Sequence, residues 1–233
     1  RNPRRTAATA SALMIGVALV TMMSVLGASA KASLDQTLAE DIVADFVVSN
    51  AVGQAFSSSV ADEIEGVEGV QTVARVRAAL LQVDGERDFA SAVDPDAVAS
   101  VARPEIVSGA LTDLDAASVA ISSELAAERV LAVGSTVTIG YAGATSEATV
   151  VAMYVEDAVL QSGVTMSLEG FDAIGVPPTD RTVYVVAEPG ADRAALATAL
   201  SDVVADLPTV TVNDQATFAA EQRAPIDQLL FIV

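Results

Sequence analysis

The feature that most constrains this chain is an uncharged, mostly apolar run near its start, Thr6–Ala30. Its twenty-five residues would extend roughly 37 Å as an α-helix, which exceeds a hydrocarbon core of about 30 Å. The apolar part of a signal peptide is usually shorter, about 7 to 15 residues. We therefore predict a transmembrane helix, with residues 1–30 forming a basic cytoplasmic flank and the span.

A cleaved signal peptide is the alternative, because Ala28-Ser29-Ala30 fits a cleavage signature. The chain would then be a secreted acidic binding domain. Leu34, Leu38, Ile42 and Phe46 recur every four residues after the run, a spacing that predicts continued amphipathic helix. This pattern favours the anchor and predicts a stalk helix over residues 31–52.

The charges give a direction across the membrane. Arg1, Arg4 and Arg5 precede the run and only Lys31 follows it closely, so the N-terminal side should be cytoplasmic. Of 12 basic and 31 acidic residues, eight basic and all 31 acidic residues lie beyond this flank, a net charge of 8 − 31 = −23. Such a surface argues against binding nucleic acid or lying flat on anionic lipid.

The C-terminal end predicts a return to the membrane. Asn213 or Asp214 can cap a helix over residues 214–233, which finishes on the apolar residues 229–233. Pro225 would kink this helix near the membrane surface. A frayed or core-docked terminus is the alternative. We expect a segment of a longer membrane protein, in the plasma membrane, with residues of about 31–225 outside.

Two stretches of the exterior region alternate helix with strand. The patterns predict helix at Gly53–Val67 and Asp192–Leu207, and strand at Val70–Val83, Arg181–Ala187 and Thr209–Asn213. Gly85 should end the Val70–Val83 strand. These units predict a helix-backed mixed sheet over residues 53–84 and 165–213.

The stretch between them, residues 85–164, has a different pattern. Short strands are expected at Ser118–Ile121, Thr136–Tyr141 and Glu147–Tyr154, with a hairpin near Gly140. We interpret this stretch as a β-rich inserted subdomain. The predicted fold class is α+β: a transmembrane helix with its stalk, then the helix-backed sheet carrying the insertion.

Missing residue types exclude much chemistry. The chain has no Cys and no His, which excludes a disulfide scaffold, a thiolate zinc site and any His-based triad or metal site. No G-x-x-x-x-G-K-[ST] motif is present, so this chain does not carry a P-loop ATPase.

Three groups of residues could be taken for metal-binding or catalytic sites, but their sequence context does not support this. Asp94 with Asp96 and Asp113 with Asp115 resemble halves of calcium loops, but turn and helix-start roles fit better. Without a visible partner cation, a solvated helix face is the better interpretation of one acidic group: Asp62, Glu63, Glu65 and Glu68. The serines lack a base: Ser57, Ser58, Ser59, Ser122 and Ser123. We predict no catalytic, cofactor-binding or metal site, no cofactor, and a protein that is not an enzyme.

Three stretches carry a family resemblance: "NPRRTAATASALMIGVALVTMMSVLGASAKAS", "VAISSELAAERVLAVGSTVTI" and "APIDQLLFIV". Together they resemble an FtsX-like ABC-transporter permease whose exterior part is similar to the MacB-like periplasmic core domain. The first stretch resembles the lead into the second permease half of actinobacterial long-form members. The resemblance implies a porter-like helix-and-sheet subdomain with a β-rich inserted subdomain, as predicted above.

The resemblance also implies the function. A permease subunit would couple hydrolysis by a separate cytoplasmic ABC ATPase to movement of the exterior domain, exporting or extracting a lipid, lipoprotein, peptide or drug. Its expected partners are that ATPase, the lipid bilayer, a second permease half or a homodimer partner, and an extracytoplasmic protein or lipid substrate. The alternative within the family is a signalling or scaffold protein that regulates cell-wall hydrolases.

Overall fold

The computed structural model describes residues 13–27, 29, 43–157, 159–215 and 217–218. The chain divides into two compact units. The first unit contains Arg1–Ala39 with Ala216–Val233, and the second contains Glu40–Gln215. The strands of the described residues all belong to the second unit.

Residues 13–27 of the first unit are helical, and their large apolar side chains are exposed on every side of the helix. These are Leu13, Met14, Ile15, Val17, Leu19, Val20, Met22, Met23, Val25 and Leu26. A helix that is apolar all round normally lies in a protein core or a membrane. Among the described residues, no helix has both the length and the hydrophobicity that a membrane crossing requires. Residues 1–12, 28 and 30–42 lie outside the described part, so the predicted span stays a prediction.

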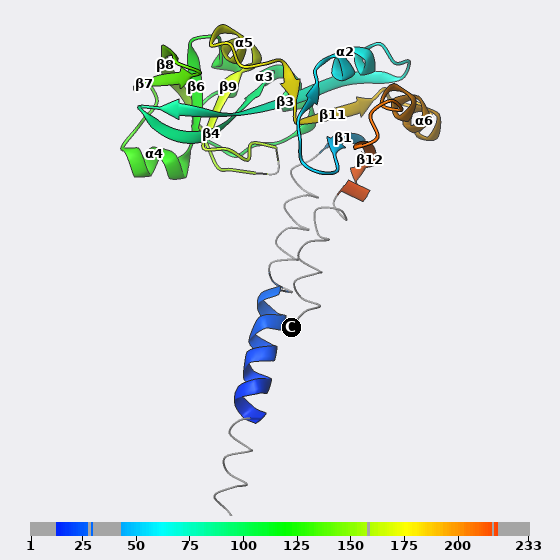
Figure 1. Ribbon diagram of the computed structural model, residues 1–233, viewed down its shortest axis with the longest axis horizontal. Helices are drawn as coiled ribbons and strands as arrows, with labels where there is room; N and C mark the ends of the chain where they lie inside the picture. The colour runs from blue at the N-terminus through cyan, green and yellow to red at the C-terminus, as the bar shows by residue number, and fades with distance from the viewer. Residues whose placement is uncertain (1–12, 28, 30–42, 158, 216, 219–233) are drawn as a thin grey trace, which may run out of the picture. The chain divides into compact units, whose positions relative to one another are not determined.

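The second unit is built on one ten-stranded sheet, whose path runs β12-β1-β11-β3-β4-β9-β6-β8-β5 (Figure 1). β7 pairs with β3 and β8 beside this path, and β2 pairs with β10 in a separate ribbon. Pairing is antiparallel except for β4 with β9 and β6 with β8. The strands are β1(Phe46–Asn50), β2(Phe56–Ser57), β3(Val70–Val83), β4(Glu86–Val93), β5(Ile106–Gly109), β6(Ser118–Ser122), β7(Thr136–Tyr141), β8(Ala144–Tyr154), β9(Val164–Ser167), β10(Thr179–Asp180), β11(Thr182–Ala187) and β12(Val210–Asp214).

Two groups of helices pack on different parts of this sheet (Figure 1). α2(Ser59–Glu65) contacts β3 and α6(Arg193–Val203), and α6 also contacts β12. α4(Ser123–Arg129) contacts β6 and β8, whereas α5(Leu168–Ala173) contacts β4 and β9. α3(Pro95–Val101) packs against β3, β11 and the short 3₁₀ helix Leu111–Asp113.

The two helix groups enclose separate hydrophobic clusters. The first cluster joins α2 and α6 to β1, β11, β12 and the start of β3, with Ile64 and Leu200 fully buried in it. The second joins α4 and α5 to β4, β6, β7, β8, β9 and the end of β3, around the fully buried Phe171. We call these parts the α2/α6 half and the α4/α5 half. β3 contributes to both.

Most strands follow the sequence pattern. β3 and β7 have the predicted bounds, and β6, β8, β11 and β12 differ from the predictions only at their ends. The hairpin from β3 to β4 turns through Asp84 and Gly85, whose φ values of 53° and 86° are those of a type I′ turn. Because Gly adopts positive φ without strain, Gly85 ends the strand as expected.

Two sequence predictions are wrong in detail. The stalk helix predicted over residues 31–52 does not reach its end, because residues 46–50 form strand β1. The helix predicted at Gly53–Val67 is restricted to Ser59–Glu65, since β2 occupies Phe56–Ser57. Asp214 is the last residue of β12 and directly precedes the helical residue 215, so it lies where the sequence predicts an N-cap, and residues 216 and 219–233 of the predicted return helix lie outside the described part.

The predicted boundary of the inserted subdomain also needs correction. It was expected to end at residue 164, but β9 starts there and packs in the α4/α5 half. α5 and the residues up to Val176 belong to the same hydrophobic cluster. The α4/α5 half therefore extends about one helix further along the chain than residues 85–164.

Candidate functional site

The chain enters and leaves the second unit on neighbouring strands. β1, the first strand after the entry, pairs antiparallel with β12, the last strand before the exit. Five residue pairs are in register, from Phe46 opposite Asp214 to Asn50 opposite Val210. The start of β1 therefore lies beside the end of β12. Both covalent connections to the first unit leave the second unit at one end of this pair.

The two strands are held differently. β1 pairs with β12 on one edge and with β11 on the other, and Phe46, Val47 and Val48 are buried. Among the described residues, β12 pairs with β1 alone and so forms an edge of the sheet. β1 is thus connected through β11 to β3.

Several contacts fix the entry segment just before β1. The Val43 amide donates to the carbonyl of Val101 at the end of α3 (2.8 Å), and the Asp45 amide donates to the carbonyl of Val185 in β11 (2.9 Å). One Asp45 carboxylate oxygen accepts from the Ala187 amide (2.8 Å), and the other lies 2.5 Å from Arg193 of α6. The entry is thus tied to α3, β11 and α6 within three residues.

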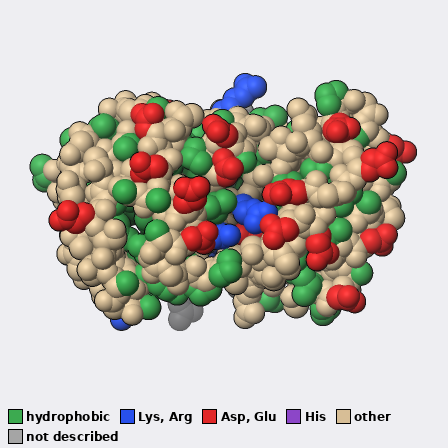
Figure 2. Space-filling model, turned by 90° about the horizontal axis from the view of Figure 1, so that it is seen from above, with side chains coloured by type: hydrophobic (Ala, Val, Ile, Leu, Met, Phe, Trp, Pro, Cys, Tyr) green, Lys and Arg blue, Asp and Glu red, His purple; other side chains and the backbone are tan. Residues whose placement is uncertain are grey.

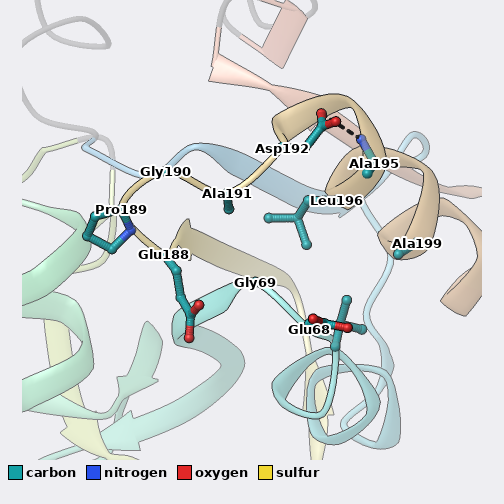
Figure 3. Close-up of a pocket in the computed structure, with 11 residues that line it drawn as sticks. Glu68, Gly69, Glu188, Pro189, Gly190, Ala191, Asp192, Ala195, Leu196 and Ala199 are labelled. Carbon is teal, nitrogen blue, oxygen red and sulfur yellow. Dashed lines mark hydrogen bonds between the residues drawn. The ribbon is translucent and has the colours of Figure 1, made fainter.

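A cavity of about 510 Å³ opens at the same end of the sheet, between the turn before β3 and the turn from β11 to α6. Figure 3 shows the carboxylates of Glu68 and Glu188 on one side and α6 with Leu196 on the other. Asp192 caps α6 by accepting from the amides of Ala194 (2.9 Å) and Ala195 (3.2 Å). Because this carboxylate already occupies the helix N-terminus, an anion gains little there.

The aspartates that resemble calcium ligands have turn and helix-start roles, as interpreted from the sequence. Asp94 caps α3 by accepting from the amides of Asp96 (2.9 Å) and Ala97 (3.2 Å). The Asp115 carboxylate accepts from the Ala117 amide (2.8 Å). Hydrogen bonds from Ala117 and Ser118 lower the pKa of Asp115.

The serines without a base have similar structural roles. Ser122 caps α4 by accepting from the Leu125 amide (3.2 Å), and the hydroxyls of Ser57 and Ser59 lie 2.8 Å apart beside the start of α2. Four other hydroxyl residues, Ser91, Tyr154, Ser162 and Thr165, form a buried network in the sheet. Burial raises the pKa of Tyr154, which keeps this phenol neutral.

The acidic group on α2 has partners that the sequence did not indicate. Arg75 of β3 lies 2.8 Å from Asp62 and 2.9 Å from Glu65. Glu63 is exposed on the same helix, and Glu68 lines the cavity described above. Asp62 and Glu65 stay mostly exposed, as expected for a solvated helix face, and the structure adds their ion pairs with Arg75. The available signal was a pair of arginines, Arg75 and Arg77, at alternate positions of the Val-rich strand β3.

Comparisons of the sequence and of the structure with known proteins both find domains of the same kind. Residues 6–203 match the family model described as the MacB-like periplasmic core domain. The periplasmic region of MacB from Actinobacillus actinomycetemcomitans shares the fold with a TM-score of 0.56 at 11% identity, over 80% of this chain and 95% of that chain. The extracellular domain of the ABC-type transporter YknZ from Gram-positive bacteria has a TM-score of 0.52 at 13% identity, over 72% of this chain and 99% of that chain. A comparison with curated proteins gives no match.

Proposed function

Because the chain belongs to the family of the MacB-like periplasmic core domain, we propose that it is the exterior part and membrane connection of an ABC-transporter permease. A separate cytoplasmic ATPase supplies the energy. Helices in the membrane carry the motion to the exterior domain, which exports or extracts a lipid, lipoprotein, peptide or drug. The chain itself catalyses no reaction, and its further partner is a second permease half or another copy of this chain.

The observation that carries this proposal is the pairing of the entry strand with the exit strand. The first unit joins the second only before β1 and after β12, and the starts of both connections lie side by side. Two membrane helices that move in opposite directions along their axes would shear β1 against β12. All five registered pairs would then bear the load together, since ladder hydrogen bonds run across the strands.

The position of β1 inside the sheet determines which part of the exterior domain would move with the membrane helix. β1 is paired on both edges, and Asp45 fastens its start to β11 and α6. A displacement at the entry therefore passes into the α2/α6 half as a whole instead of peeling off one strand. Transmission through β1, with β12 as the return, is the mechanism we propose.

The membrane end of the mechanism rests on the apolar helix. Residues 13–27 are helical and expose large apolar side chains on every side, which would be costly in water. Thr6–Ala30 is the proposed span, with Arg1, Arg4 and Arg5 in the cytoplasm. Residues of about 31–225 then lie outside the plasma membrane, and residues 215 onward begin the return helix.

The test is an ATPase measurement on the complete permease, reconstituted with its ATPase in lipid vesicles. Transport predicts that one candidate from the lipid, lipoprotein, peptide or drug classes stimulates ATP hydrolysis and moves across the membrane. Stimulation only by a cell-wall hydrolase would contradict transport and favour the signalling role. A permease that never binds an ATPase would contradict both.

A further inference from the structure

A strip of charged residues separates the two hydrophobic clusters of the second unit. Arg75 and Arg77 alternate with Val76 on β3, so both side chains point to one face of the sheet. Their guanidinium groups lie between α2 of one half and α5 of the other. Figure 2 looks down on the face that carries α2 and α5, and basic side chains near its middle are surrounded by acidic ones.

Each arginine contacts a different part of the structure. Arg75 pairs with Asp62 and Glu65 of α2, at 2.8 Å and 2.9 Å. Arg77 pairs with Asp172 of α5 at 2.7 Å. The network thus has one arm to a helix of the α2/α6 half and another to a helix of the α4/α5 half.

Asp180 of β10 lies beneath the two arginines. Its side chain is fully buried, and its nearest charged contact is Arg77 Nε at 3.5 Å. Within the part of the chain that the structure describes, neither Asp180 carboxylate oxygen nor Arg77 Nε has a hydrogen-bond partner. Burial disfavours the charged form of Asp180, so this carboxylate depends on the charges of Arg75 and Arg77.

Strand β3 changes its pairing partner next to the two arginines. β11 pairs with β3 from Val70 to Val76, whereas β4 pairs with β3 from Val76 to Val83. Only Val76 has registered partners in both, Thr182 and Val93. On each side of Val76, β3 therefore pairs with just one of these two strands. A bend here disrupts fewer ladder contacts than a bend within a fully paired strand.

We propose that β3 is a hinge at Val76 and Arg77, and that the arginine network is the latch that holds the α2/α6 half and the α4/α5 half together. When the latch opens, water reaches Asp180 and solvates the carboxylate, which is fully buried in the closed form. This gain offsets part of the lost ion pairing. The closed and open forms can therefore lie close in free energy, as a conformational switch requires.

The inference goes beyond the proposed function, because the hinge is a property of the exterior domain without any ATPase. The acidic residues of the latch come from three elements. Asp62 and Glu65 lie on α2, Asp172 lies on α5 and Asp180 lies on β10. In the permease, the motion entering through β1 would first move the α2/α6 half. The latch decides whether the α4/α5 half follows rigidly.

The test measures the distance between the halves in the complete permease in lipid nanodiscs, without ATP. This chain has no native cysteine. With any cysteine elsewhere in the permease replaced by serine, Glu63→Cys on α2 and Ala173→Cys on α5 accept two spin labels at exposed sites. The test variant is Arg77→Gln with Asp180→Asn, which leaves no unpaired buried charge and should fold. Arg75→Gln removes the ion pairs with α2 and one of the two positive charges near Asp180. We expect the double variant at least to double the width of the distance distribution, and Arg75→Gln to widen it less.

A matched control is available in Arg129→Gln. Arg129 also joins a helix to β3 and β4, through Glu86 (3.2 Å), Asp88 and the Val83 carbonyl, but all these contacts lie within the α4/α5 half. It should leave the distribution between Glu63 and Ala173 unchanged. A second label pair, Glu128→Cys with Ala173→Cys, lies within that half and should stay narrow in every variant.

Two results would overturn the latch. The distribution could stay as narrow in the Arg77→Gln, Asp180→Asn variant as in the parent, or Arg129→Gln could widen it equally. Because no ATP is present, either result is independent of whether the permease couples to an ATPase.

Discussion

The single substitution Arg77→Gln tests the electrostatics of the buried strip most sharply. It keeps much of the side-chain volume and removes the positive charge nearest to Asp180, whose side chain is fully buried. Breaking a buried ion pair from one side typically costs about 3 to 5 kcal/mol, because the remaining charge is left uncompensated. Asp180 can avoid this penalty by taking up a proton.

The proton uptake sets an upper limit on the effect. For an ordinary aspartate pKa of about 3.9, protonation at pH 7 costs about 4 kcal/mol, at 1.36 kcal/mol per pH unit. Burial already raises the pKa of Asp180 despite the opposing charges of Arg75 and Arg77, so the actual cost is lower. We expect Arg77→Gln to lower the free energy of opening of β3 by about 2 to 4 kcal/mol at pH 7.

The pH dependence has a definite sign. A carboxyl whose pKa is raised in the folded state favours folding when protonated, so its contribution is present at low pH and is lost as the pH rises. The defect of Arg77→Gln should therefore shrink between pH 7 and pH 5, by at most about 2.7 kcal/mol for one proton. Asp62, Glu65 and Asp172 face the same arginines and remain in every variant, so Asp180→Asn isolates the contribution of Asp180.

The assay is hydrogen–deuterium exchange of β3 and β10 in the complete permease at both pH values, corrected for intrinsic exchange rates. Arg77→Gln with Asp180→Asn should exchange more slowly at pH 7 than Arg77→Gln alone, because no buried charge remains unpaired. The reasoning would be refuted if Arg77→Gln lowered the free energy of opening of β3 by less than about 0.5 kcal/mol, or by the same amount at pH 5 and pH 7.

Three further predictions concern separate elements. Val17→Arg should block stable membrane insertion, since a charge at mid-bilayer costs at least about 2.5 to 3.5 kcal/mol; normal abundance in the membrane fraction would contradict the span. Val130→Gly should raise the free energy of opening of α4 by about 0.5 to 1 kcal/mol and so slow its hydrogen exchange. Val130 is 90% exposed and has a φ of 57°, a strained backbone conformation that glycine adopts freely, at some cost in chain entropy. Faster exchange of α4 would count against this. Asp94→Ala should destabilise α3 by about 1 kcal/mol through loss of its N-cap, seen as roughly fivefold faster exchange there; unchanged exchange would refute the capping role.

The sheet was largely predictable because its strands carry local signals. Val70–Val83 is rich in β-branched residues and is bounded by Gly69 and by the turn at Gly85, so its bounds were found correctly. β1 was missed because Phe46 continues a four-residue spacing from Leu34. The consecutive apolar residues Phe46, Val47 and Val48, which are all buried, were the better signal for a strand covered on both faces.

The charged strip was not predictable in the same way. Arg77 and its partner Asp172 are separated by 95 residues, and no local pattern indicates that the fold brings α5 to β3. Two arginines at alternate positions of the Val-rich strand β3 were the local signal for a charged face. Which carboxylates cover it depends on tertiary structure, and Asp180 lies in a two-residue strand that carries almost no pattern.

The pairing of the entry and exit strands likewise depended on topology. Val210–Asp214 was expected as a strand, but its place beside β1 required β1 to be recognised first. The family resemblance indicated a permease without indicating how motion enters the exterior domain. In the described sheet β1 pairs with β11 and β11 with β3, which is the route that we propose.

The central claim is that β1 carries motion from the membrane helix into the exterior domain, and a flexible insertion tests it most directly. Four glycines between Val43 and Ala44 would interrupt the connection just before the contacts of Asp45, while the same insertion between Asp84 and Gly85 lengthens an exposed hairpin turn as the control. In vesicles with the ATPase, we predict that the first insertion abolishes substrate-coupled activity but keeps basal ATP hydrolysis, and that the control keeps both. Equal coupled activity in the two variants, with normal exchange protection of β3, would contradict transmission through β1.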